Sequence, residues 1–126
     1  MTEEQKKYIE ANIDLIDEER WKEFFKNAPK GIGGVLYEVG IHFLEKLRYV
    51  PNSAFYDSNI QTIDIPERVT RIGNYAFYKC SKLTSITIPK GVTIIGNSTF
   101  AGCKSLKSIV IPDSVTRIEG EAFIAC

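Results

Sequence analysis

The sequence is poor in the residues from which catalytic and metal sites are usually built. Its 126 residues include three cysteines, one histidine and one methionine. Three cysteines are too few, and odd in number, for a disulfide framework, so we expect a reducing compartment, the cytoplasm. The only histidine, His42, excludes any catalytic set that needs a second one. We therefore predict no enzymatic activity, no metal site and no cofactor.

Membrane segments and a dominant charge are also missing. No run of about 18 apolar residues is present, so we expect no membrane span. The chain begins Met1-Thr2-Glu3-Glu4, which is acidic where a secretory signal needs positive charge. Sixteen basic and sixteen acidic residues give a net charge of zero. This balance argues against a globally basic nucleic-acid-binding protein, but it leaves room for a local basic patch.

The zero net charge hides two unlike parts. Residues 1–45 contain ten acidic and six basic residues, a net charge of −4, and residues 46–126 carry the opposite +4. Nine bases against three acids lie between residues 46 and 112, and these bases form a candidate basic band: Lys46, Arg48, Arg68, Arg71, Lys79, Lys82, Lys90, Lys104 and Lys107. Such an asymmetry points to a partner of the opposite sign or to a division between domains.

The second part is an internal repeat, whose markers recur at one constant interval. They are the Ile-Pro pairs at 65–66, 88–89 and 111–112, the phenylalanines at 77, 100 and 123, and the cysteines at 80, 103 and 126. A less regular first copy ends in Asn52-Ser53-Ala54-Phe55, and its interval is one residue shorter, so one residue is missing near Asp57. We count about 3.5 repeats, which predicts a stacked architecture.

Each repeat has a local structural interpretation. Leu83, Ile86 and Ile88 alternate with polar residues, which predicts a half-buried strand that ends at proline. A second extended segment with Val92 and Ile95 also faces inward. Gly73 and Gly96 are expected at tight corners, and the Ala-Phe-x-x-Cys segment is expected to form a short helical or 3₁₀ turn.

These residues resemble a known family. The run Leu-x-x-Ile-x-Ile-Pro, then Val-Thr-x-Ile-Gly, then Ala-Phe-x-x-Cys is similar to the BspA-like leucine-rich repeat, over about residues 45–126. The resemblance implies a ladder of strands, a role in protein–protein or cell-surface recognition, and no catalysis. Surface-exposed members carry export signals, so the missing signal argues against an adhesin. The predicted fold is α+β: a short leucine-rich-repeat solenoid with an N-terminal helical cap.

Residues 1–44 do not match the repeat and predict helices. Thr2-Glu3-Glu4-Gln5 is a capping-box pattern, and Ile9, Ile13 and Ile16 form one helical stripe. Asp17 can cap a second helix containing Trp21, Phe24 and Phe25, and a third runs from Ile32 to Phe43 after a Gly-rich loop at 30–34. We expect two units, 1–44 and 45–126. The first either caps the repeats or binds a partner.

The repeat surface holds the predicted binding site. Tyrosine and arginine are enriched at protein interfaces, and nearby lysines could meet an acidic partner. The residues expected to bind a partner protein are Tyr56, Arg71, Tyr78, Lys79, Lys82, Lys104, Lys107 and Arg117. The expected function is a non-catalytic protein–protein interaction module. One specific form is a phage- or mobile-element-borne inhibitor that blocks a host nucleoprotein complex. The alternative is a nucleic-acid-binding protein that uses the basic band.

The last repeat has no visible cap in the sequence. Its end is expected to expose a strand edge and apolar side chains, and exposed edges pair with other chains. Either Phe123, Ile124 and Cys126 fold over this end, or two copies of the chain meet there as a homodimer.

Overall fold

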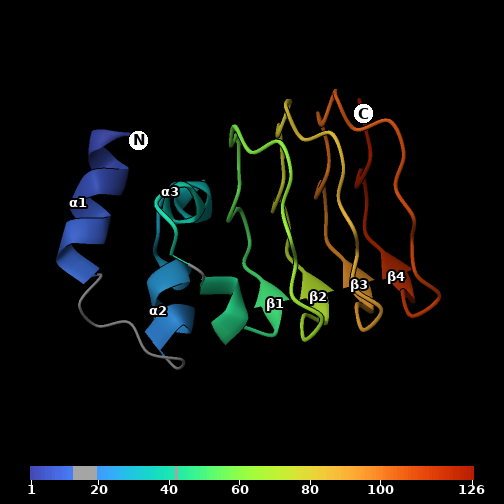
Figure 1. Cartoon of the computed structure of the whole chain (residues 1–126), viewed down its shortest axis with the longest axis horizontal. Coiled ribbons are helices and arrows are strands. Elements are labelled where there is room, and N and C mark those ends of the chain that lie inside the picture. Colours follow the sequence, from blue (N-terminus) through green and yellow to red (C-terminus); the bar gives the residue numbers. More distant parts are fainter. Residues whose placement is uncertain (13–19, 42) are drawn as a thin grey trace.

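The computed structural model describes residues 1–12, 20–41 and 43–126. The helices that the structure describes lie at one end of the molecule, and the repeats follow in a row toward the other (Figure 1). The helical elements are α1 (Glu3–Asn12), α2 (Arg20–Lys26), α3 (Ile32–Glu38) and η2 (Phe43–Lys46).

Each repeat contributes one two-residue strand to a parallel sheet. The strands are β1 (Tyr49–Val50), β2 (Arg71–Ile72), β3 (Ile94–Ile95) and β4 (Arg117–Ile118), and they pair in sequence order. Val50 pairs with Ile72, and Ile72 pairs with Ile95. The first step is thus one residue shorter than the second, which confirms the missing residue in the first copy.

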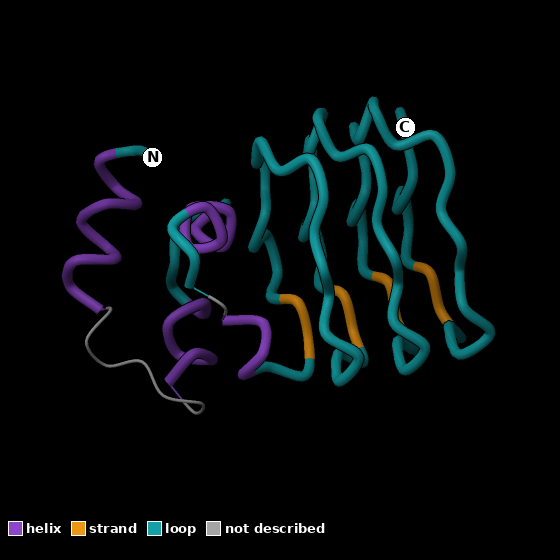
Figure 2. Tube along the Cα trace, viewed as in Figure 1, coloured by secondary structure: helices purple, strands orange, loops and turns teal. Residues whose placement is uncertain are grey.

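The strands lie in the second extended segment of each repeat, not in the first (Figure 2). In the segment predicted as a strand, Leu83, Ile86 and Ile88 are buried, so the predicted alternation of burial is right. Between residues 84 and 88, however, only the Thr84 N–H donates to the backbone of the preceding repeat. The predicted strand is therefore an extended segment that lacks a ladder.

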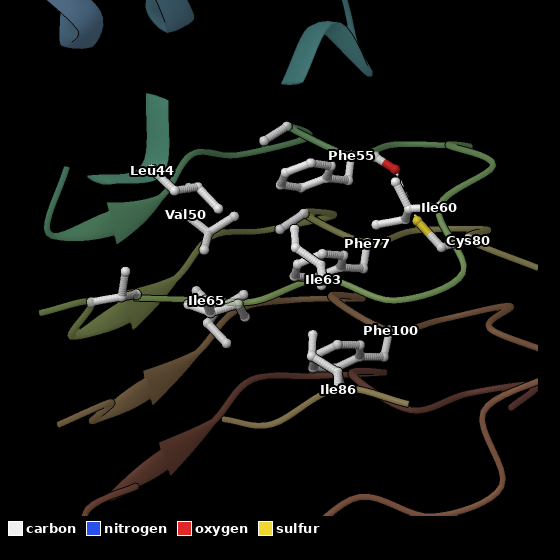
Figure 3. Close-up of a cluster of buried hydrophobic side chains, with 14 of the residues drawn as sticks. Leu44, Val50, Phe55, Ile60, Ile63, Ile65, Phe77, Cys80, Ile86 and Phe100 are labelled. Atoms are coloured by element: carbon white, nitrogen blue, oxygen red, sulfur yellow. Dashed lines mark hydrogen bonds between the residues drawn. The ribbon is translucent and has the colours of Figure 1, made fainter. Parts of the chain in front are cut away.

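A column of phenylalanine rings forms the centre of the core. The rings of Phe55 and Phe77 stack with centroids 5.2 Å apart, and Phe100 and Phe123 continue the column at 5.4 Å per step. Figure 3 shows three of these rings one above the other, with Ile63 and Ile86 packed beside them. The apolar positions of the sequence repeat thus become a continuous stack.

Left-handed backbone corners separate the segments of each repeat. One set of corner residues comprises Ser53, Tyr75, Ser98 and Glu121, and a second comprises Asp57, Lys79, Gly102 and Ala125. In the first three repeats, the N–H of each corner residue donates to a carbonyl of the next repeat. The segment ending in cysteine is a series of turns whose backbone bonds span three residues, as in a 3₁₀ turn: the Tyr78 N–H donates to the Tyr75 carbonyl, and the Cys80 N–H to the Phe77 carbonyl. It is not a continuous helix, because Tyr75 and Lys79 are left-handed.

Gly73 and Gly96 do not have the positive φ that tight corners suggest. They are glycines because of close approach: a Cβ at Gly73 would lie 2.6 Å from Oδ1 of Asn52, and one at Gly96 would lie 2.5 Å from Oδ1 of Asn74. These amides link the repeats, because Asn52 Oδ1 accepts from the Asn74 N–H and Asn74 Oδ1 from the Asn97 N–H.

The N-terminal capping box is confirmed. The Gln5 N–H donates to Thr2 Oγ1 at 3.0 Å, and the Thr2 N–H donates to Gln5 Oε1 at 2.8 Å. Trp21 and Phe24 lie in the predicted second helix, α2, and are buried. The predictions on Ile13, Ile16 and Asp17 lie outside the described residues.

The third helix is shorter than predicted, and the Gly-rich loop is partly helical. Gly33 and Gly34 belong to α3, where a Cβ would lie 2.6 Å from the Ala54 carbonyl oxygen and from Ser58 Oγ, respectively. The helix ends at Glu38 because Gly40 is left-handed, with φ of 82°. Close packing of α3 on the first repeat explains these glycines.

Packing between the helices and the first repeat is continuous. The ring of Phe43 contacts both Trp21, at 5.7 Å between centroids, and Phe55, at 5.9 Å. The Gly31 N–H donates to the Ser53 carbonyl. One hydrophobic cluster therefore runs from α2 into the repeats.

Candidate interaction surface

Two tyrosines, Tyr56 and Tyr78, stack on each other at corresponding turns of the first and second repeats. The rings of Tyr56 and Tyr78 lie 4.9 Å apart, because each follows an aligned phenylalanine of the core column. The ammonium of Lys30 lies 4.9 Å from the Tyr56 ring centroid, and that of Lys79 lies 5.5 Å from the Tyr78 centroid. The repeat thus holds both rings in fixed positions at the surface, where they are half-buried.

A hollow of about 450 Å³ opens beside Tyr78, the second of these two tyrosines. Its wall is lined by residues of successive repeats, among them Tyr75, Tyr78, Lys79, Lys104 and Ile124. We call the group Tyr56, Tyr75, Tyr78, Lys79 and Lys104 the tyrosine–lysine surface. Asp57 and Glu121 line the same hollow, so its charges are mixed.

The other predicted partner-binding residues lie elsewhere. Arg71 and Arg117 are exposed on β2 and β4, and the Arg71 guanidinium lies 5.5 Å from the Tyr49 ring centroid. Lys82 and Lys107 are exposed, and in the described structure no contact joins them to the tyrosine–lysine surface or to Arg71 and Arg117. The structure therefore brings together Tyr56, Tyr78, Lys79 and Lys104 and separates the remaining four.

Sequence reasoning missed Tyr75 of this surface and Lys30, which lies over one of its rings. Tyr75 is 42% exposed and lies against Tyr78 at 5.4 Å between ring centroids. Its close spacing to Tyr78 within a turn is the signal that could have found it. Lys30 comes from the helical part of the chain, so no pattern in the repeat could place it over Tyr56.

The cysteines form a ladder of thiols, each bonded to the preceding repeat. Cys80 Sγ donates to the Phe55 carbonyl at 2.9 Å, and Cys103 Sγ to the Phe77 carbonyl at 3.1 Å. Burial raises the pKa of both Cys80 and Cys103 to about 12. Such thiols are protonated and inert at neutral pH, so they fill the core rather than react.

In the part of the chain that the structure describes, no group of three or more histidine, cysteine, aspartate or glutamate side chains could hold a metal ion. His42, the only histidine, lies outside the described residues.

The predicted edge residues lie in the fourth repeat. Phe123 stacks on Phe100 and is half-buried, Ile124 is 55% exposed, and Cys126 is exposed while its Sγ donates to the Phe100 carbonyl. Phe123 and Cys126 thus contact the third repeat, but they do not cover the apolar side chains of the fourth.

A second, larger groove of about 780 Å³ lies along the first extended segments of the third and fourth repeats. Ile86, Thr87, Ser108 and Val110 contribute to its lining. Val110 is 82% exposed, and it occupies the repeat position of the polar Thr87. This face is therefore less polar in the last repeat.

Comparison with known proteins gives a family and a fold. A family model described as the BspA type leucine-rich repeat region matches residues 38–126 with six copies. A leucine-rich repeat protein from Bacteroides ovatus is 42% identical over 64% of this chain, with a TM-score of 0.62. A leucine-rich repeat protein from T. pallidum is 32% identical over 63% of it, with a TM-score of 0.61.

The matched parts are 21% and 37% of those two solved chains. No curated protein matches the sequence. In the part of the chain that the structure describes, no helix is both long and apolar enough to cross a membrane. The family model covers most of the chain, and the two solved proteins are leucine-rich repeat proteins. The chain therefore belongs to the BspA-type leucine-rich repeat family.

Proposed function

We propose that this chain is a non-catalytic protein–protein interaction module and that its partner binds the tyrosine–lysine surface. The observation that carries the proposal is the stack of Tyr56 on Tyr78 beside a hollow of about 450 Å³. Tyrosine buries much area with few rotatable bonds and is enriched among the residues that dominate binding energy.

The scaffold supports this role because it limits the motion of the rings. The N–H of Asp57, next to Tyr56, donates to the Tyr78 carbonyl at 2.7 Å, and the N–H of Lys79, next to Tyr78, donates to the Ala101 carbonyl at 2.8 Å. Rings fixed before binding lose little conformational entropy when a partner arrives. A rigid aromatic surface suits recognition of a folded protein.

Mixed charge favours a protein partner over a nucleic acid. Lys79 and Lys104 share the hollow with Asp57 and Glu121, so a phosphate backbone would meet carboxylates as well as ammonium groups. The nucleic-acid alternative predicts an affinity that falls steeply with salt, whereas a protein interface of this composition predicts a weak dependence. A salt titration of the captured complex separates the two.

The narrower form of the proposal is an inhibitor, borne by a phage or a mobile element, that occupies the binding surface of a host nucleoprotein in the cytoplasm. A small module with one rigid aromatic surface is sufficient for such blocking. We further propose that the repeats form a short solenoid and that the N-terminal helices cap it. The contact of Phe43 with Phe55 supports this role for the helices, because it covers the first ring of the column.

Affinity capture from the native host tests the function. The tagged chain is compared with the variant Tyr56→Ala/Tyr78→Ala and with the control Arg71→Ala/Arg117→Ala, which changes exposed residues on the strand side. We expect the tyrosine variant to bind the partner roughly thirtyfold or more weakly than the natural chain does, and the control variant to keep its affinity. Loss in the arginine variant alone would place the binding site on the sheet and contradict the proposal. Recovery of a nucleoprotein subunit would support the inhibitor form.

A further inference from the structure

The third repeat carries small side chains at three corner positions where the second repeat carries large ones. In order along the chain, these positions hold Tyr75, Tyr78 and Lys79 in the second repeat and Ser98, Ala101 and Gly102 in the third. The backbone register continues through this step, because the Lys79 N–H donates to the Ala101 carbonyl and the Gly102 N–H to the Ile124 carbonyl. The third repeat therefore leaves space at the surface without a break in the array.

The three small residues all line the hollow of about 450 Å³ beside Tyr78. Ser98 and Ala101 are buried and form its floor, with Tyr78 of the second repeat and Ile124 of the fourth repeat on its two sides. The third repeat has a neighbouring repeat on each side. The hollow is therefore a consequence of side-chain size inside the array.

The stack of surface tyrosines stops at this hollow. Tyr56 and Tyr78 occupy successive copies of one repeat position, with ring centroids 4.9 Å apart, and Ala101 is the next copy. Because the repeats stack in sequence order, Tyr56 covers one side of the Tyr78 ring and the hollow lies on the other. Aromatic rings attract one another at about this spacing. The hollow thus lies where a third ring of the stack would be.

The charges around the hollow favour a neutral ring over a charged group. Lys79 and Lys104 line it together with Asp57 and Glu121. A carboxylate or an ammonium group placed here would be attracted by two of these side chains and repelled by the other two. A neutral ring avoids this repulsion, and its electron-rich face attracts a cation such as the Lys79 ammonium, which already lies 5.5 Å from the Tyr78 ring centroid. Shape and charge therefore favour the same occupant.

We propose that the hollow binds one aromatic side chain of the partner protein, which stacks on Tyr78 in the space that Ala101 leaves. This inference rests on the proposed function, because it names the group that the tyrosine–lysine surface recognises. A volume of about 450 Å³ lies in the range of pockets that hold small molecules, so a ring and its adjoining backbone fit. Lys79 reaches across Gly102, where an added Cβ would lie 3.3 Å from the Lys79 Cγ, and its ammonium group lies beside the entering ring.

A small aromatic probe tests the hollow directly. N-acetyl-phenylalanine amide is titrated into the isotope-labelled chain, and N-acetyl-cyclohexylalanine amide, which is of similar size but not aromatic, is the matched control. We expect the phenylalanine probe to shift the amide NMR signals of Ala101 and Gly102 with a Kd of about 1–10 mM, and the cyclohexyl probe to bind roughly fivefold more weakly. No shift at about 20 mM probe, or equal affinity for both probes, would overturn the proposal.

Three variants locate the binding. Ala101→Tyr fills the hollow with a ring of the chain itself, at a position where two other repeats carry tyrosine, and it should weaken binding of the phenylalanine probe by roughly tenfold or more. Ser85→Tyr adds a tyrosine at an exposed position on the first extended segment of the same repeat, so the affinity should be unchanged. Tyr78→Leu keeps an apolar side chain but removes the stacking partner, and it should also weaken binding.

Circular dichroism checks the fold of each variant. If Ala101→Tyr does not fold, Tyr78→Leu decides the outcome. A probe that binds every folded variant with the affinity of the natural chain would overturn the proposal, because its site would then lie elsewhere.

Capture from the native host separates this inference from the proposed function. A partner that is lost from both Tyr56→Ala/Tyr78→Ala and Ala101→Tyr supports the hollow as its site, provided that the phenylalanine probe binds there. A partner lost from the tyrosine variant but kept by Ala101→Tyr would support the proposed surface and overturn the aromatic side chain in the hollow. A partner that both variants keep would overturn the proposed surface and, with it, the partner site in the hollow.

Discussion

The third repeat (83–103) and the fourth repeat (106–126) have the same sequence pattern but different surroundings. Val92 and Ile95 are fully buried, whereas their counterparts Val115 and Ile118 are half-buried and exposed. The ring of Phe100 is sandwiched between two others at 5.4 Å, and that of Phe123 is stacked on one side only. The difference lies in the neighbours and not in the residues themselves.

The comparison teaches how stability is distributed in such an array. Each repeat supplies roughly one half of every interface that it forms with an adjacent repeat. Its side chains are therefore fully buried only when it has a neighbour on both sides. Interior repeats should then tolerate substitutions poorly, and the last repeat should tolerate the matched substitutions well. The predictions below compare positions inside the array with positions near its last repeat, from the largest expected difference to the smallest.

The phenylalanine column should give the largest difference. Phe77→Ala removes a fully buried ring with stacked neighbours at 5.2 and 5.4 Å, and it should cost about 3–5 kcal/mol of unfolding free energy. Phe123→Ala removes a half-buried ring and should cost about half as much. Urea unfolding followed by circular dichroism measures both. Equal losses would show that the open end is covered in solution.

The glycines that approach asparagine side chains should come next. Gly96→Ala places a Cβ 2.5 Å from Asn74 Oδ1 and 2.7 Å from the Asn74 nitrogen, so it should cost about 1–3 kcal/mol. At Gly120 the nearest atom to a Cβ is Asn97 Oδ1, at 3.6 Å. Gly120→Ala should change the melting temperature little. A comparable loss at both positions would contradict the close-approach explanation.

The asparagine links should have a smaller effect. Asn74→Ala removes the acceptor that binds the Asn97 N–H at 2.9 Å, and it should cost about 1 kcal/mol. Asn97→Ala should cost only about a few tenths of a kcal/mol, because in the described structure the Asn97 Oδ1 accepts no hydrogen bond from the Gly120 N–H. Denaturant midpoints at constant slope measure the difference. If Asn97→Ala is the more costly change, the fourth repeat is linked more firmly than the structure indicates.

The reactivity of the cysteine thiols should distinguish the last repeat from the earlier ones, without any change in the stability of the chain at neutral pH. At pH 8 an alkylating reagent should modify the exposed Cys126 and spare the buried Cys80 and Cys103, so mass spectrometry should find one adduct. Three adducts on the folded chain would contradict this.

The same thiols predict a loss of stability in alkaline solution. Burial holds the pKa of Cys80 and Cys103 near 12 in the folded chain, above the value of about 8.5 for an unfolded chain. The unfolded chain then releases its protons first. The stability that these groups contribute is fully present below about pH 8.5 and is lost as the pH rises toward 12. Cys80→Ala/Cys103→Ala should flatten the pH dependence of the unfolding free energy in this range.

The periodicity of the sequence predicted the structural features that recur from one repeat to the next. The aligned phenylalanines and cysteines indicated the repeat length, and the shorter first step appears in the register of Val50 with Ile72. The capping box at Thr2 and Gln5 was also predictable, because it is a local pattern of hydrogen bonds. These features need only the sequence neighbours of a residue or its copy in the next repeat.

Features that depend on contacts between dissimilar segments were not predictable. Gly33 and Gly34 suggested a loop, but they lie in α3 because Ala54 and Ser58 leave no room for side chains. The position of Lys30 over Tyr56 likewise joins the helical part to the repeats. The strand was predicted in the wrong segment. Side-chain burial alternates in both extended segments of a repeat, but backbone hydrogen bonds form a ladder in only one of them.

The left-handed corners determine from which end the molecule loses its structure. A residue other than glycine in this conformation costs about 1–2 kcal/mol. At Tyr75 and Lys79 the N–H donates to the following repeat, which offsets part of the strain. At Glu121 and Ala125, with φ of 60° and 58°, the described residues provide no acceptor. Fraying should therefore begin there, and amide hydrogen exchange should slow repeat by repeat from the last corner toward the helices.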